Sequence, residues 1–128
     1  MNLASYVRDI PNFPQHGILF RDITPLLKDP TIFDYIINSF LDYYSTQSID
    51  VVAGIESRGF LFATPLAMQL GKPMIPVRKE GKLPYKTNSA RYSLEYGEGV
   101  LEIHTDAIDP GQRVLIVDDL LATGGTIQ

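Results

Sequence analysis

Two aspartates and a run of small residues near the end of the chain have the residue types needed to bind a phosphorylated sugar. Asp118 and Asp119 directly follow an apolar run at residues 114–117. An ionised carboxylate only accepts hydrogen bonds, so it suits sugar hydroxyl groups. The small-residue loop leads into a predicted helix, and its backbone N–H groups together with the helix N-terminus favour a phosphate as ligand. This loop consists of Ala122, Thr123, Gly124, Gly125 and Thr126.

The run before the aspartates predicts how they are positioned. Residues 114–117, VLIV, are typical of a strand buried on both faces of a parallel sheet. Ligands of open parallel sheets bind at the carboxyl ends of the strands. The patterns GxxxxGK[ST] and GxGxxG do not occur, which disfavours a nucleoside triphosphatase or a dinucleotide site. The alternative interpretation is a buried strand that ends in a polar turn without a ligand.

Composition restricts the class of protein. With 128 residues, of which 45% are hydrophobic and 20% charged, we expect a single domain over residues 1–128. The net charge of −4 gives no support for nucleic-acid binding. The chain has no cysteine, no apolar run long enough to span a membrane and no signal peptide pattern, so the sequence predicts a cytoplasmic protein with neither membrane nor nucleic-acid partner.

The remaining patterns predict an α/β fold with a mainly parallel central sheet flanked by helices. Buried strands are expected at 50–55, 73–77 and 113–117, and a one-sided strand at 100–105. A largely buried helix is expected from Pro30 to Tyr44, with Asp29 as its N-cap. A second helix is expected at 60–70, with Pro65 near its first turn or at a kink and with Gly71 as its C-terminal cap. Residues 2–10 predict a short amphipathic helix, and residues 17–24 an edge strand or extended loop.

Residues 78–98 are rich in charge and poor in apolar periodicity, which predicts a mobile excursion from the sheet. Arg78, Lys79 and Lys82 lie where they could bind an anionic ligand at the carboxyl edge. A solvated charged hairpin without a ligand explains the same composition. His16 and His104 have no second ligand at metal-binding spacing, so no protein metal site is predicted.

The motif VLIVDDLLATGGT resembles the 5-phosphoribosyl-1-pyrophosphate (PRPP) binding motif of type I phosphoribosyltransferases. Four further stretches, GILFRDITPLLKDP, AGIESRGF, RKEGKLPY and RYSLEYG, resemble one branch of that family, the adenine phosphoribosyltransferases. The resemblance spans nearly the whole chain. It implies a hood over residues 1–28 and a core over residues 29–128, which includes a mobile hairpin.

The resemblance also implies an activity. Members of this family are transferases of the glycosyltransferase class that act in purine salvage: they move the 5-phosphoribosyl group from PRPP to adenine and give AMP and pyrophosphate. Magnesium, held mainly by PRPP, and a homodimer are implied in the same way. A non-catalytic protein that senses PRPP or a nucleotide, and the same reaction on another purine base, remain as alternatives.

The family's site residues can be transferred only by matching motifs. The loop 122–126 would hold the 5'-phosphate, and the two aspartates would lie along the ribose hydroxyls. The turn from Glu56 to Gly59, in which Ser57 and Arg58 are the candidate ligands, would lie against pyrophosphate, as would the basic stretch. Tyr96 would also lie near the pyrophosphate.

The base and the proton are assigned to other residues in the same way. Backbone groups of Leu19 and Arg21 would bond the purine edge, while Phe20 and Leu120 would lie against its two faces. Glu95 would transfer the proton at the base. By residue type alone, Arg58 and Glu95 are ordinary exposed residues and Phe20 is a core residue.

The chain ends at Gln128, two residues after Thr126, whereas the family continues with further helices and a strand. A phosphate-binding helix reduced to a stub loses dipole and rigidity, and the sheet would be left with an open apolar edge. We therefore expect the C-terminal elements to be missing or replaced by a partner or a second copy, with reduced or absent activity for the chain as given.

Overall fold

The computed structural model describes residues 2–94 and 97–118. The chain divides into two compact units, residues 1–40 and 41–128. The second unit contains a five-stranded mixed sheet, whose strands lie in the order β5 (Thr87–Leu94), β6 (Gly97–His104), β4 (Met74–Lys79), β3 (Val51–Ile55) and β7 (Val114–Val117). In the part of the chain that is described, no helix has the length and apolar character needed to cross a bilayer.

The first unit begins with a 3-10 helix η1 (Leu3–Tyr6) and a strand β1 (Arg8–Pro11) that pairs antiparallel with β2 (Leu19–Asp22). The expectation of one amphipathic helix over residues 2–10 is therefore wrong. Four apolar residues at helical spacing are too weak a signal when the backbone can pair with a second strand, as Ile10 does with Phe20. The extended segment predicted at 17–24 is confirmed as β2.

Two helices follow, α1 (Thr24–Lys28) and α2 (Pro30–Tyr44). The predicted cap is confirmed, because Asp29 Oδ1 accepts a hydrogen bond from the Thr31 N–H at 3.0 Å. The predicted burial of α2 is wrong for most of its apolar side chains. Tyr43 is 65% exposed, and the buried ones are Ile32, Ile36 and Ile37. Aromatic residues made the helix look apolar on more than one face, but its fully buried stripe consists of isoleucines alone.

The second unit has three parallel strands at its centre, β3 (Val51–Ile55), β4 (Met74–Lys79) and β7 (Val114–Val117). β3 lies between the other two and all five of its residues are buried, as its apolar run predicts. A hairpin of β5 (Thr87–Leu94) and β6 (Gly97–His104) continues the sheet antiparallel to β4. Part of the stretch at 78–98, which was expected to leave the sheet, thus forms regular strands. The mobility of this stretch stays a prediction.

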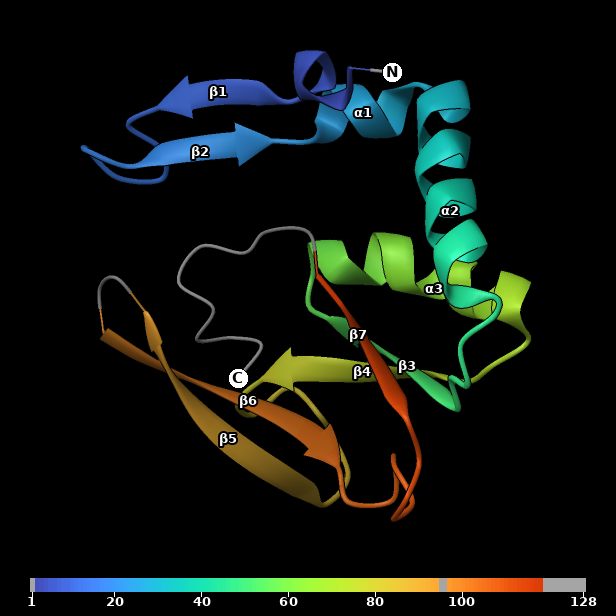
Figure 1. The fold of residues 1–128 in the computed structure, drawn as a ribbon. Helices are drawn as coiled ribbons and strands as arrows, with labels where there is room; N and C mark the ends of the chain where they lie inside the picture. The colour runs from blue at the N-terminus through green and yellow to red at the C-terminus, as the bar shows by residue number, and fades with distance from the viewer. Residues whose placement is uncertain (1, 95–96, 119–128) are drawn as a thin grey trace. The chain divides into compact units, whose positions relative to one another are not determined.

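Helix α3 (Arg58–Leu70) lies on one face of this sheet (Figure 1). It begins earlier than expected and continues through Pro65, which lies well inside the helix instead of in its first turn. Helix α3 packs closely against β3 at Gly54, where a methyl group in place of the glycine hydrogen would lie 2.7 Å from the Cβ of Ala63. Gly71 ends the helix with φ at 68°, as predicted for its C-terminal cap.

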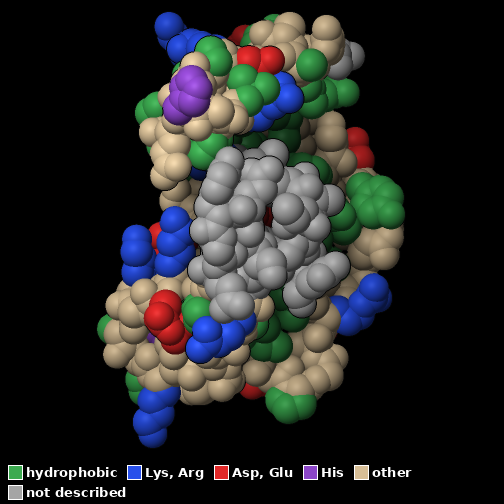
Figure 2. All heavy atoms as spheres, turned by 90° about the vertical axis from the view of Figure 1, so that its left-hand side faces the viewer, with side chains coloured by type: hydrophobic (Ala, Val, Ile, Leu, Met, Phe, Trp, Pro, Cys, Tyr) green, Lys and Arg blue, Asp and Glu red, His purple; other side chains and the backbone are tan. Residues whose placement is uncertain are grey.

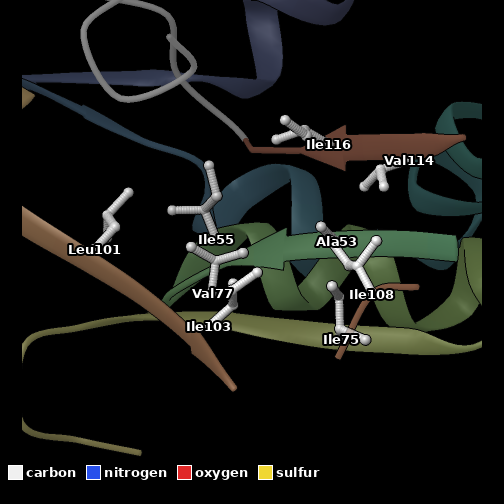
Figure 3. A pocket seen from close by; sticks show the side chains of 9 residues that line it. All are labelled: Ala53, Ile55, Ile75, Val77, Leu101, Ile103, Ile108, Val114 and Ile116. Carbon is white, nitrogen blue, oxygen red and sulfur yellow. The ribbon is translucent and has the colours of Figure 1, made fainter. Parts of the chain in front are cut away.

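The opposite face of the sheet is lined by aliphatic side chains around a cavity of about 290 Å³ (Figure 3). Ala53, Ile75 and Val114 contribute from three neighbouring strands. Ile116 also lines the cavity but is 44% exposed, so the expectation that β7 is buried on both faces is wrong. An apolar run shows that a strand can be buried, but it does not show that its second face is covered.

Candidate active site

The three parallel strands end at the same edge of the sheet, and the predicted polar residues follow them there. Gly54 on β3 is in register with Pro76 on β4 and with Val117 on β7. The turn with Ser57 and the start of α3 at Arg58 therefore lie beside the end of β7 and Asp118. This arrangement is the ligand-binding edge of an open α/β sheet.

Gly59 allows the first turn of α3 to contact the end of β7. A methyl group at this position would lie 2.7 Å from the carbonyl oxygen of Val117 and 3.3 Å from the Cα of Asp118. It would also lie 3.5 Å from Oδ1 of Asp118, which is half-buried. The glycine thus brings the helix N-terminus and this carboxylate together.

Basic side chains accumulate at the end of β4. Figure 2 shows Lys and Arg side chains at the surface of one face of the molecule. The side chains of Arg78 and Lys82 are 36% and 49% exposed. Lys79, also predicted as an anion ligand, is exposed at the end of the strand. These three residues are therefore brought to the same edge as Asp118.

Sequence reasoning placed Glu56 in the turn against pyrophosphate but gave its side chain no role, whereas in the structure this side chain connects Arg78 and Lys82. Its Oε1 accepts hydrogen bonds from the Lys79 N–H at 2.8 Å and from Arg78 Nε at 3.3 Å. Its Oε2 accepts one from Lys82 Nζ at 3.1 Å. The Glu56 side chain is only 7% exposed. The available signal was its position, one residue after β3 and opposite the end of a parallel strand followed by basic residues.

The surroundings of Glu56 favour its charged form. Burial raises the pKa of the Glu56 carboxyl, but the hydrogen bond from the Lys79 N–H and the charges of Lys82 and Arg78 outweigh it. The pKa of Glu56 therefore lies below its usual value. Two partly exposed cations are held close together because the carboxylate between them is ionised.

This shift predicts a pH dependence of stability. A carboxyl group with a lowered pKa in the folded chain stabilises the fold above its unfolded pKa of about 4.3, and the contribution is lost as the pH falls through the lower folded value. Glu56→Gln should therefore lower the unfolding free energy most above about pH 5, with the deficit shrinking in acid. Urea unfolding at several pH values measures this. The exposed Glu80→Gln is the control, and a deficit that is constant with pH would contradict the prediction.

Proteins with similar sequences support the interpretation of this geometry as an active site. Residues 23–128 match the model of the phosphoribosyl transferase domain family. The adenine phosphoribosyltransferase of Halothermothrix orenii is 56% identical over the whole chain, which covers 75% of that protein. The chain belongs to the adenine phosphoribosyltransferase family.

Solved structures of the family have the same fold. The crystal structure of the enzyme from Rhodothermus marinus matches with a TM-score of 0.92 at 50% identity, over 98% of this chain and 71% of that one. The enzyme from Saccharomyces cerevisiae was crystallised with adenine and an imino-altritol bisphosphate. It matches with a TM-score of 0.88 at 43% identity, over 98% of this chain and 73% of that one. The type I phosphoribosyltransferase fold predicted from sequence is confirmed.

The residues that the family resemblance assigns to the base lie in the first unit, on β2. Leu19 is 48% exposed. Phe20 is half-buried, with its ring centre 5.2 Å from that of Phe13 at an edge-to-face angle. Arg21 Nη1 donates to Asp9 Oδ1 at 2.6 Å. Their contact with a purine stays a prediction, as it does for the family's other base residue, Leu120.

Several predicted site residues of the family lie outside the described residues. These are Glu95, Tyr96, Asp119, Leu120, Ala122, Thr123, Gly124, Gly125 and Thr126. Of the predicted set, the structure thus brings together Ser57, Arg58, Arg78, Lys79, Lys82 and Asp118. This subset consists mainly of the residues predicted to face pyrophosphate, with one of the two ribose aspartates.

Proposed function

We propose that this chain transfers the 5-phosphoribosyl group of PRPP to adenine, giving AMP and pyrophosphate in purine salvage. The observation that carries the proposal is the placement of Arg78 and Lys82 at the same sheet edge as Asp118. A cluster of cations beside a sugar-binding carboxylate suits a substrate that carries both a pyrophosphate and free hydroxyls. The names of relatives 53–60% identical to the chain support adenine as the base.

In the proposed reaction, the bond between ribose C1 and a pyrophosphate oxygen breaks and its electron pair leaves with pyrophosphate. A bond forms between C1 and N9 of adenine, and the proton that the base loses at N7 would pass to the Glu95 carboxylate. Arg58, Arg78 and Lys82 neutralise charge on the leaving group. Asp118 and Asp119 accept hydrogen bonds from the ribose hydroxyls, and the loop at 122–126 binds the 5'-phosphate.

Magnesium enters this proposal as an ion carried by PRPP. In residues 2–94 and 97–118, no group of three or more His, Cys, Asp or Glu side chains is placed to hold a metal. Both Glu56 oxygens already accept hydrogen bonds from basic residues. The oxygens of the substrate and water are the donors that fit such an ion. When bound, the metal would stabilise negative charge on the pyrophosphate.

Calorimetric titration of purine bases in the presence of PRPP, together with measurement of the nucleotide product, tests the function. We expect adenine to bind and AMP and pyrophosphate to form in equal amounts. Preferred binding of hypoxanthine, guanine or xanthine would show that this purine, and not adenine, is the substrate base. Binding of PRPP without any nucleotide product would favour the alternative of a sensing protein.

We also infer a homodimer, on the basis of the family resemblance, and a cytoplasmic location, on the basis of the sequence composition. Sedimentation equilibrium at several protein concentrations measures the oligomeric state, and a mass of one chain at all of them would overturn the homodimer.

A further inference from the structure

We propose that Glu56 is a positioning residue, which holds Arg78 and Lys82 as a preformed pair of ligands for the pyrophosphate group. The inference rests on the proposed function and deepens it, because it assigns a role to an acidic residue in a site meant for an anion. An acid there opposes anion binding by simple charge. Glu56 can assist anion binding only through a second effect that outweighs this repulsion.

The contacts of Glu56 leave the phosphate-binding atoms of both cations available. Glu56 accepts from Nε of Arg78, and Nη1 of Arg78 donates to the carbonyl oxygen of Lys82 at 3.5 Å. Neither contact uses Nη2 of Arg78, whose hydrogens can bind phosphate oxygens. Lys82 uses one of its three ammonium hydrogens for Glu56. The carboxylate thus fixes each cation at one point and leaves further donors for a ligand.

The backbone of the same turn is fixed as well. Glu56 Oε1 accepts from the Lys79 N–H, and Glu102 Oε1 accepts from the Gly81 N–H at 2.9 Å. Gly81 has φ at 84°, a left-handed conformation that favours glycine. Two carboxylates, from the end of β3 and from β6, therefore hold the turn between Arg78 and Lys82 on both sides.

Without Glu56, two neighbouring cations would repel each other and two long side chains would regain rotamer freedom. Binding pyrophosphate would then have to order both side chains again. Because Glu56 is nearly buried and its partners are partly exposed, the ordering is already present before a ligand arrives. If Glu56 positions the two cations, removing its charge should weaken pyrophosphate binding. If Glu56 acts only through its negative charge, removing that charge should strengthen binding.

The test compares Glu56→Gln with Glu80→Gln, which removes the same charge from an exposed side chain in the same turn. Calorimetry with magnesium pyrophosphate should show about tenfold weaker binding for Glu56→Gln, the low end of the loss seen when orienting partners are removed at metal sites. Glu80→Gln should bind within about twofold of the parent. In turnover, KM for PRPP should rise for Glu56→Gln while KM for adenine stays the same.

Two additional variants separate positioning from a general effect on folding. Glutamine keeps an oxygen for the Lys79 N–H, so the variant should fold, which circular dichroism checks. Glu56→Asp keeps the charge but shortens the side chain, and it should also weaken binding because it cannot reach both sides of the turn. In a Lys82→Met background, the effect of Glu56→Gln should shrink, since one of its two partners is gone.

Equal or tighter pyrophosphate binding by Glu56→Gln would overturn the inference. Tighter binding would mean that the carboxylate competes with the ligand for the cations. A parent chain that binds neither PRPP nor pyrophosphate would instead overturn the proposed function, so the two failures are distinguishable.

Discussion

Gly59→Ala should lower turnover about a hundredfold and also destabilise the fold. The added methyl group would lie 2.7 Å from the carbonyl oxygen of Val117, a backbone atom that cannot rotate away. Either the N-terminus of α3 or the end of β7 must shift. Overpacking of this kind costs about 1–3 kcal/mol in stability. A shift of about 1 Å at catalytic groups is enough for a hundredfold loss of rate.

The matched control is Gly71→Ala, at the other end of the same helix. Gly71 has φ at 68° and open space around it, so alanine strains the backbone there but meets no neighbouring atom. We expect a stability loss of about 1 kcal/mol without loss of turnover at a temperature where the protein is folded. Urea unfolding and steady-state kinetics on both variants make the comparison. Equal losses of turnover would show that α3 does not position the site through Gly59.

Local signals in the sequence predicted the elements whose surroundings are also local. The strand at β3 follows from five apolar or small residues that are buried on both faces. The start of α2 follows from the Asp29 side chain and Pro30, which act within one turn. The end of α3 follows from the left-handed Gly71. In each case neighbouring residues decide the outcome.

The errors arise where distant segments decide. Residues 8–11 form a strand because β2 pairs with them, and no residue within that stretch records its partner. Tyr43 on α2 and Ile116 on β7 are exposed although their residue types are typical of a core. Burial depends on which other element covers a face, so apolar periodicity alone overestimates it.

Prediction of the site likewise succeeded where the signal was local and failed where a distant segment decides. Motifs located Asp118 and the basic residues, because strand ends of a parallel sheet meet at one edge. The role of Glu56 within its turn was missed because its partners Arg78 and Lys79 lie on β4, more than twenty residues along the chain. A glutamate at a strand end has no signal of its own until the register of the neighbouring parallel strand places Arg78 and Lys79 beside it.

Glu95 is the residue for which we expect the largest effect on the chemical step. The family resemblance assigns it the proton at the purine ring, and removal of a general acid or base lowers kcat by about 10²–10⁴-fold. Glu95→Gln keeps the size and hydrogen-bonding reach of the side chain but cannot exchange this proton. We therefore expect kcat to fall by about this factor, while calorimetric affinities for PRPP and adenine change little.

Glu98→Gln is the control for Glu95, because it removes the same charge three residues along the chain and has no predicted role. A proton-transfer role also predicts that the loss for Glu95→Gln is confined to the chemical step, so single-turnover rates should fall as much as steady-state rates. Wild-type turnover by Glu95→Gln would remove the catalytic assignment. It would leave the pyrophosphate-side assignment of Arg78 and Lys82 intact, because that assignment rests on the geometry at the end of β4 and not on the base.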